Sequence, residues 1–122
     1  MTPMTTMPPT WRSASRILAS GCEYVLITGT HETGETVVHR LFGPEGYESQ
    51  EACPRLAHVY HGSGCTLAAA VAGLLARGMA VPEAVSTAQR YTWDALRHAA
   101  RPGHGQHLPD RLFWAPPERG LR

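Results

Sequence analysis

The sequence predicts a single α/β domain, and three patterns along the chain indicate this fold class. A short helical pattern over residues 13–20 is followed directly by a continuous apolar run over residues 23–28, which is typical of a buried strand. Two longer helical patterns follow at residues 66–77 and 82–100. The whole chain has 122 residues, enough for one hydrophobic core and too few for two well-built ones.

The first helix and the first strand are separated by a glycine. Ala14, Ile17 and Leu18 fit one face of a short helix, and Gly21 stands where a helix can end in a left-handed residue. The following segment reads EYVLIT, from Glu23 to Thr28. Because aromatic and β-branched residues follow one another without alternation, we expect a strand that is buried on both faces.

A second strand is expected soon after the first. Residues 29–36 read GTHETGET and are rich in turn formers, whereas residues 37–42 read VVHRLF. The pair predicts a β-hairpin with Gly34 at its tip. Residues 43–46, GPEG, end the second strand, and residues 47–58, which include Pro54, are expected to form a loop with at most one edge strand.

The helix predicted over residues 66–77 is rich in alanine and should lie in the core. Apolar side chains recur at helical spacing, and the remaining positions are small enough for close packing on nearly all sides. Arg77 and Gly78 provide a basic last turn and a stop signal.

The next predicted helix begins at Pro82, which suits a first helical position, and runs to about Ala100. Its apolar stripe indicates a half-exposed helix that Pro102 and Gly103 terminate; the stripe comprises Val85, Ala88, Thr92, Ala95 or Leu96, and Ala99. The remainder, from His104 to the C-terminus, has no periodicity, and residues 112–114, Leu-Phe-Trp, would anchor it if a groove were present.

Composition excludes several classes of protein. Apolar residues make up 43% of the chain, charged residues 17%, and the formal net charge is +1, so the sequence is typical of soluble globular proteins and argues against nucleic acid as the main partner. No apolar stretch approaches the length of a membrane span. The three cysteines are widely spaced without a CxxC pair, which favours a reducing cytoplasm over a disulfide framework.

The first residues read MTPMTTMPPT and have neither the charged nor the apolar region of a secretory signal. We expect residues 1–12 to be a disordered lead-in, residues 13–115 to form the domain, and residues 116–122 to be a tail.

The most informative motif is HGSGCT, which leads into the alanine-rich helix. Its glycines allow a tight turn, and the helix that follows adds free N–H groups and the positive end of its dipole, so the motif predicts an anion site. The pattern is not a P-loop, because no lysine follows the second glycine. A thiolate at Cys65 would be stabilised by the same field. A structural alternative remains open, in which Ser63 is only an N-cap and Cys65 a small apolar filler.

The order of segments gives a more specific indication. From Ser13 to Ala115 the chain closely resembles the C-terminal half of hydroxymethylpyrimidine/phosphomethylpyrimidine kinases, which belong to the ribokinase-like superfamily. The segments that carry the resemblance are YVLITGTH at 24–31, YHGSGCTLAAAVA at 60–72, Gly78 with PEAV at 82–85, and PGHG at 102–105. The resemblance implies the C-terminal portion of a three-layer α/β/α fold.

The resemblance also implies an activity and its residues. The family transfers the γ-phosphoryl group of ATP, with Mg²⁺, to hydroxymethylpyrimidine and then to its monophosphate in thiamine biosynthesis. By position, Gly62, Ser63 and Gly64 correspond to the anion hole, and Cys65 corresponds to the catalytic base that removes the hydroxyl proton. Thr28 and Gly29 correspond to a loop near the nucleotide, where the family often has lysine in place of Thr28.

Length is the main departure from the family. The pyrimidine pocket and the acidic residues associated with magnesium cannot be assigned in this sequence, which implies a fragment, a mis-started reading frame or a degenerate relative. A non-catalytic α/β module derived from the kinase is the alternative. It would be stabilised by a partner or as a homodimer, because a partial sheet exposes a strand edge that can pair with another chain.

Two histidine pairs, His58 with His61 and His104 with His107, have spacings that suit metal ligands on a helix. Neither pair lies in a predicted helix and no third ligand is fixed by spacing, so we assign no metal residues. Tyr91 and Trp93 are expected to be packing residues, because no basic patch accompanies them.

Overall fold

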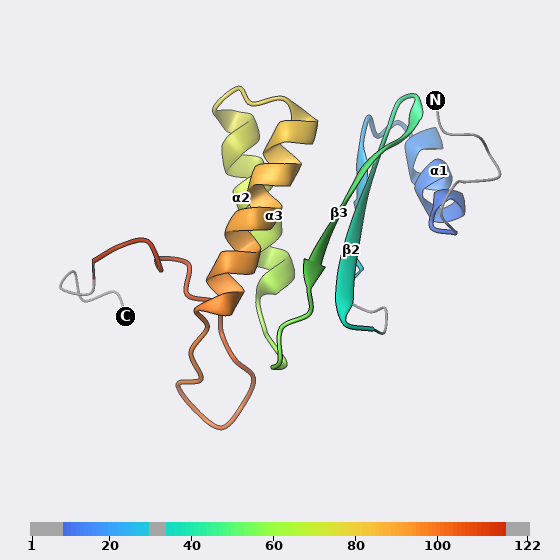
Figure 1. Ribbon diagram of the computed structural model, residues 1–122. Coiled ribbons are helices and arrows are strands. Elements are labelled where there is room, and N and C mark those ends of the chain that lie inside the picture. Colours follow the sequence, from blue (N-terminus) through green and yellow to red (C-terminus); the bar gives the residue numbers. More distant parts are fainter. Residues whose placement is uncertain (1–8, 30–33, 117–122) are drawn as a thin grey trace. The chain divides into compact units, whose positions relative to one another are not determined.

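The computed structural model describes residues 9–29 and 34–116 of the chain (Figure 1). The chain forms two compact units, Met1–Arg55 and Leu56–Arg122. The first unit holds one helix and three strands, and the second holds two helices and the C-terminal segment.

The N-terminal unit begins with helix α1, Trp11–Ala19, two residues earlier than the sequence pattern indicated. The Ala14 amide donates to the Thr10 carbonyl at 3.0 Å, which sets the start of the helix. The predicted end is confirmed, since Gly21 has a φ of 115° that only glycine adopts readily. Of the expected lead-in, residues 1–8 lie outside the described residues, as do residues 117–122 of the expected tail.

The three strands form an antiparallel sheet in the order β1-β2-β3, comprising β1 Val25–Ile27, β2 Thr36–Gly43 and β3 Gly46–Pro54. The predicted pairing of the first two strands is confirmed, with Leu26 opposite Leu41. Gly34 lies in the connection with a φ of 120°, while residues 30–33 fall outside the described part.

Strand β3 is longer than the expected edge strand, because a tight turn pairs it with β2 from its first residue. Gly43 lies opposite Gly46, and Gly46 has a φ of 108° that a residue with a side chain would adopt only under strain. Pro54 is the last residue of the strand, where its missing N–H costs no interior ladder bond.

The expectation that the first strand is buried on both faces is wrong for this structure. All three residues of β1 are half-buried, and the strand pairs only with β2 among the described residues. A short strand with one paired edge has too few neighbours to exclude water from both faces.

The core of the N-terminal unit lies between α1 and β2. Phe42 is fully buried and is flanked by the rings of Trp11 and Tyr47, with ring centroids 5.7 and 5.5 Å away. Leu41 is also buried, and Ala14 of α1 has no exposed surface. The amphipathic face of α1 therefore folds onto the sheet through aromatic contacts.

In the C-terminal unit, helix α2, Ser63–Ala76, packs against helix α3, Val81–Arg97 (Figure 1). The predicted stripe on α3 is confirmed by the burial of Val85, Ala88, Thr92 and Ala95. The helix ends three residues before the predicted Ala100, because Ala100 instead forms a two-stranded bridge with Leu108.

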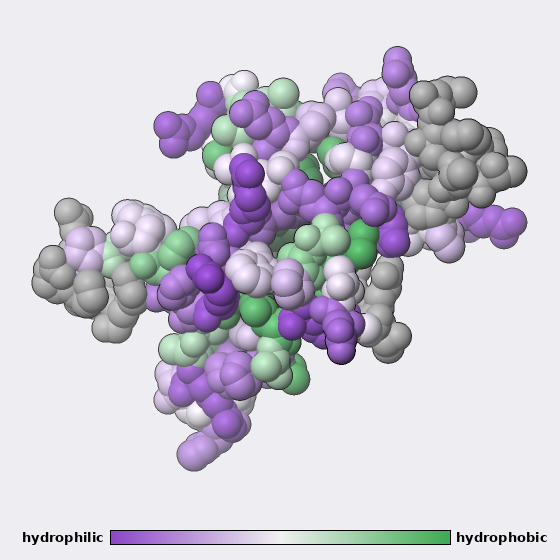
Figure 2. Space-filling model, viewed as in Figure 1, coloured by the Kyte–Doolittle hydropathy of each residue, from purple (hydrophilic) through white to green (hydrophobic). Residues whose placement is uncertain are grey.

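The expectation that the alanine-rich helix packs on nearly all sides is also wrong for this structure. Only Thr66 and Leu67 of α2 are buried, and Leu75 is 39% exposed. Within the described part of this unit, α3 is the helix that contacts α2, so the remaining faces stay open. Apolar groups are correspondingly visible among hydrophilic ones on the surface in Figure 2.

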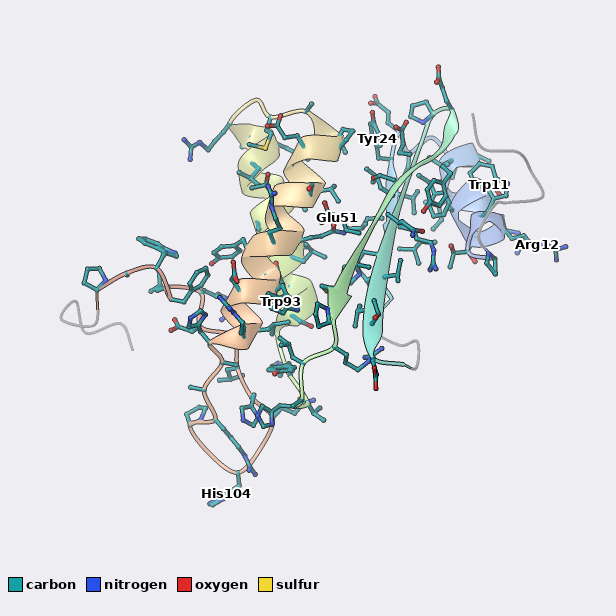
Figure 3. All side chains as sticks on the ribbon, viewed as in Figure 1. Trp11, Arg12, Tyr24, Glu51, Trp93 and His104 are labelled. Carbon is teal, nitrogen blue, oxygen red and sulfur yellow. The ribbon has the colours of Figure 1, made fainter. Side chains whose placement is uncertain are left out.

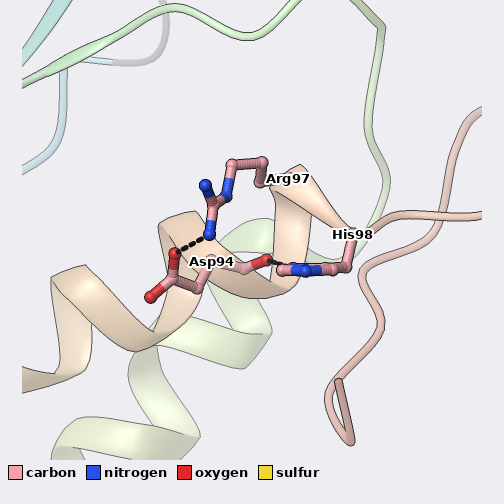
Figure 4. A network of polar contacts seen from close by, with 3 residues as sticks. All are labelled: Asp94, Arg97 and His98. Atoms are coloured by element: carbon pink, nitrogen blue, oxygen red, sulfur yellow. Dashed lines mark hydrogen bonds and ion pairs between the residues drawn. The ribbon is translucent and has the colours of Figure 1, made fainter. Parts of the chain in front are cut away.

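The expected anchor of the C-terminal segment is confirmed for one of its aromatic residues. The ring of Phe113 stacks on His98 with centroids 5.1 Å apart and also contacts Tyr91, whereas Trp114 is 66% exposed. His98 is held in turn by the Asp94 carbonyl, 2.8 Å from its Nδ1 (Figure 4). The carboxylate of Asp94 pairs with Arg97 at 3.2 Å.

No helix in the described part of the chain is both long enough and apolar enough to cross a bilayer.

Gly29 gives a first test of the sheet. A Cβ at this buried position would collide with the backbone carbonyl of Val38, which cannot move without breaking the hairpin. Gly29→Ala should therefore lower the free energy of unfolding by about 2 kcal/mol, measured by urea titration with far-UV circular dichroism.

Gly43→Ala is the matched control, because the three atoms nearest to its Cβ would all belong to the flexible side chain of Glu48, which can move away. It should cost less than about 1 kcal/mol. Equal losses of unfolding free energy in the two variants would show that the backbone contact at Gly29 is not what destabilises Gly29→Ala.

Candidate functional site

The HGSGCT motif forms the turn that opens α2. Gly62 is the N-cap of the helix, in a left-handed conformation with φ 92° and ψ 5°, and Ser63 is the first helical residue. No side chain caps this helix end. The structural alternative in which Ser63 serves as the N-cap is therefore wrong.

Three consecutive backbone N–H groups remain free at this turn. The first helical hydrogen bond runs from the Thr66 amide to the Gly62 carbonyl at 3.0 Å. The preceding amides of Ser63, Gly64 and Cys65 have no acceptor among the described residues, as helix geometry requires. Together with the positive end of the helix dipole, these donors suit a phosphate group.

Cys65 is the third residue of α2, in its first turn, and it is exposed. Its exposure excludes the interpretation that it is a buried apolar filler. The thiol at this position is accessible to solvent.

Arg111, from the C-terminal segment, contacts this turn, and no sequence pattern indicated it. Its Nε donates to the hydroxyl of Thr66 at 3.0 Å, and that hydroxyl donates to the Gly62 carbonyl at 2.7 Å. Its Nη2 lies only 2.9 Å from where a Cβ of Gly62 would be. Forty-five residues separate Arg111 from Thr66, so no local pattern could have revealed the contact.

The residues before the turn are fixed by a short bridge to the C-terminal segment. Tyr60 pairs with His107 in a parallel bridge, in which the His61 amide donates to the His107 carbonyl at 2.9 Å and the His107 amide donates to the Val59 carbonyl at 2.9 Å. This bridge holds the residue that directly precedes Gly62.

The two histidine pairs meet through His58 and His107. Their rings stack with centroids 3.9 Å apart at an angle of 11°, and the segments that contain them are not helical. Partial burial lowers the pKa of His107, and the neighbouring charges of His58 and Arg101 lower it further. His104 lies at the outer end of this loop (Figure 3).

Thr28 and Gly29, the predicted nucleotide-loop residues, belong to the N-terminal unit. The Gly29 amide donates to Nδ1 of His39 at 3.1 Å, a contact that the sequence did not indicate. The turn of the C-terminal unit holds Gly62, Ser63, Gly64 and Cys65, whereas Thr28 and Gly29 are candidates within the N-terminal unit.

No group of three or more His, Cys, Asp or Glu side chains lies together in the part of the chain that the structure describes. We therefore assign no magnesium ligands.

Tyr91 and Trp93 behave as packing residues, as predicted. The Tyr91 hydroxyl donates to the Arg111 carbonyl at 2.6 Å, and Trp93 on α3 (Figure 3) is half-buried beneath the guanidinium of Arg97, 5.3 Å from its ring. Burial raises the pKa of Tyr91. The charge of Arg111 lowers this pKa and the charge of Asp110 raises it, with burial as the largest effect, so the hydroxyl keeps its proton and remains a donor.

The fold and this turn define the class: the chain is an α/β fragment of the ribokinase-like fold. It resembles the pyridoxal kinase of Staphylococcus aureus in complex with AMP-PCP and pyridoxal, with a TM-score of 0.79 and 24% identity over 85% of this chain and 39% of that one. It also resembles an ADP complex of Bacillus subtilis pyridoxal kinase, with a TM-score of 0.68 and 29% identity over 80% of this chain and 37% of that one.

The sequence profile of phosphomethylpyrimidine kinase matches residues 2–110, so the chain belongs to the phosphomethylpyrimidine kinase family. It is 43% identical over 86 residues to the hydroxymethylpyrimidine/phosphomethylpyrimidine kinase of Streptomyces coelicolor. This alignment covers 70% of this chain and 31% of that protein. The chain thus spans about a third of the length of the curated relatives that it matches.

The anion site can be tested by alkylation of the three cysteines. Phosphate held by the free amides at the start of α2 would shield the thiol of Cys65. At phosphate concentrations that mostly fill the site, iodoacetamide should therefore label Cys65 at least twofold more slowly, as measured by peptide mass spectrometry. Cys22 is exposed and is the control, because it should be unaffected.

Cys53 should label slowly with or without phosphate, because the pKa of its thiol is raised. Burial is the largest cause and the charge of Glu51 adds to it, while the charge of Arg55 lowers the pKa. Equal protection of Cys65 and Cys22 by phosphate would count against an anion site at the turn.

The stacked histidines predict a pH dependence of the C-terminal unit. Because the pKa of His107 is lower in the folded chain than in the unfolded one, its contribution to stability is complete above about pH 6.5 and is lost as the pH falls through the folded value. A nuclear magnetic resonance titration should give a midpoint for His107 below 6.5, and His58→Gln should raise it by removing a like charge. An unchanged midpoint in that variant would exclude coupling between the two rings.

Proposed function

We propose that this chain carries the phosphoryl-transfer segment of an ATP-dependent hydroxymethylpyrimidine/phosphomethylpyrimidine kinase of thiamine biosynthesis. The observation that carries the proposal is the turn at Gly62, which presents three free amides, an exposed cysteine and an arginine at one helix end. Membership of the phosphomethylpyrimidine kinase family supports the same reaction class.

The chemistry assigns distinct roles to the residues of the turn. ATP supplies the γ-phosphoryl group when bound. The amides of Ser63, Gly64 and Cys65 would stabilise the negative charge that develops on its oxygens. As the acceptor oxygen bonds to phosphorus and the bond to the β-phosphate oxygen breaks, the Cys65 thiolate would take the hydroxyl proton. The products are the phosphorylated pyrimidine, ADP and a neutral thiol.

Hydroxymethylpyrimidine is the proposed acceptor because relatives named hydroxymethylpyrimidine/phosphomethylpyrimidine kinase match this chain at up to 43% identity. Pyridoxal is the competing acceptor, since the structural relatives include pyridoxal kinases and a Bacillus subtilis pyridoxine kinase is 35% identical over 88 residues.

A second candidate function is a non-catalytic module that associates with another chain or with itself. The exposed faces of α2 and the outer edges of β1 and β3, with which no further strand pairs in the described part of the chain, favour this alternative. Exposed strand edges and apolar helix faces commonly mark surfaces that another polypeptide covers.

Activity of the isolated chain should be very low. Transfer requires an aligned acceptor, and misplacement by about 1 Å can cost about a hundredfold in rate. We expect little or no phosphorylation of hydroxymethylpyrimidine by the 122-residue protein. Fusion of the N-terminal part of the Streptomyces coelicolor relative should restore turnover, measured by chromatography of the pyrimidine monophosphate.

In the fused protein, Cys65→Ala should lower kcat at least about a hundredfold through loss of the general base, and Cys22→Ala should leave it unchanged. Pyridoxal, tested in parallel, should be the poorer acceptor. Rapid turnover by the chain alone would show that it completes its own pocket, for example as a homodimer, whereas an inactive fusion would favour the non-catalytic module.

A further inference from the structure

The loop of residues 100–108 is a small closed unit within the C-terminal segment. Its two ends pair with each other, because Ala100 and Leu108 exchange backbone hydrogen bonds of 3.1 and 2.8 Å. Inside the loop, the guanidinium of Arg101 donates to the carbonyls of Gly105 at 2.9 Å and of His104 at 2.7 Å. These contacts all lie within the loop, so it can move as one body.

Backbone and amide hydrogen bonds attach this loop to the residues before α2. His107 forms two backbone hydrogen bonds of 2.9 Å, one with Val59 and one with His61. The side-chain amide of Gln106 donates to the Tyr60 carbonyl at 3.4 Å. Val59 is 68% exposed, and backbone hydrogen bonds with little apolar burial around them open easily. The attachment therefore depends on the rings that lie beside it.

Two histidine rings lie across this attachment. His58 belongs to the segment before α2 and His107 to the loop, and their rings stack with centroids 3.9 Å apart at an angle of 11°. The ring of Tyr60 meets each of them at a steep angle, with centroids 6.2 and 6.0 Å away. The stack is thus a direct side-chain contact between the loop and the segment that leads into α2.

Acid adds positive charge to this contact. Partial burial lowers the pKa of His107, and the charges of His58 and Arg101 lower it further. His61 and His104, on the two segments that are joined, gain positive charge over the same pH range. Because the pKa of His107 is lower when the loop is attached, protonation of this ring favours release, increasingly so below about pH 6.5.

We propose that the stack of His58 on His107 is an acid-sensitive latch, which releases the loop of residues 100–108 from the segment before α2 when both rings carry a proton. The release is local, because the C-terminal segment is also tied to α3, where the Asp110 amide donates to the Ala95 carbonyl at 3.0 Å. That bond joins two backbone groups, which do not titrate. Opening the latch frees the approach to α2, and the inference does not depend on phosphate binding at the turn.

The test is amide hydrogen exchange of the ¹⁵N-labelled full chain at about pH 7.5 and about pH 5, the range over which histidine changes charge. The intrinsic exchange rate of an unstructured peptide at the same pH, divided by the observed rate, gives a protection factor for each amide. The factors of the His61 and His107 amides should fall about fivefold in acid, the scale set by repulsion between two charges at this separation in water. The amides of Ala100, Leu108 and Asp110 should keep their protection.

His58→Phe keeps a flat ring for stacking but cannot take a proton, so the loss of protection in acid should disappear. His104→Phe is the matched control, because it makes the same substitution on the loop but outside the stack, and it should retain the loss. The amide spectrum of each variant reports whether the fold is kept, and the unchanged chain tests the latch without any substitution.

Three results would overturn the latch. Equal protection of the His61 and His107 amides at both pH values would show that the attachment does not open. An equal loss at Ala100, Leu108 and Asp110 would show that acid unfolds the whole unit and not the attachment alone. An undiminished loss in His58→Phe would place the acid-sensitive group elsewhere.

Discussion

The left-handed backbone of Gly62 is the constraint on which the C-terminal unit depends. With a φ of 92°, it turns the chain directly into α2, so that the helix starts without a side-chain cap and its first amides stay open. Any other residue would be strained in this conformation, and its Cβ would also clash with the guanidinium of Arg111. One glycine therefore determines the direction of the helix, the free donors and the room for a guanidinium at the same point.

The surroundings of that turn are held by contacts between distant segments. Arg111 is fixed through Thr66 on α2 and Tyr91 on α3, and the bridge between Tyr60 and His107 holds the approach to Gly62. These hydrogen bonds are individually modest, at about 1 kcal/mol each, but they act on one short loop. The order of the site thus comes from a few polar contacts between the helices and the C-terminal segment.

The sequence predicted the local part of the candidate site, because glycines, a cysteine and a helix start are all encoded within six residues. It could not predict Arg111, which lies 45 residues from its partner Thr66, or the stacking of His58 on His107. Both contacts depend on how the C-terminal segment returns to α2, and the spacing within each histidine pair suggested metal ligands instead of ring stacking.

The sequence by itself determined the type and order of most elements. Periodicity and glycine signals placed both long helices and the first hairpin, since backbone preference and side-chain spacing act over a few residues. Burial was decided only by tertiary structure, because it depends on which neighbours are present. The apolar sequences of β1 and α2 are both typical of core elements. In the structure, however, β1 is half-buried with one paired edge, and α2 buries only Thr66 and Leu67.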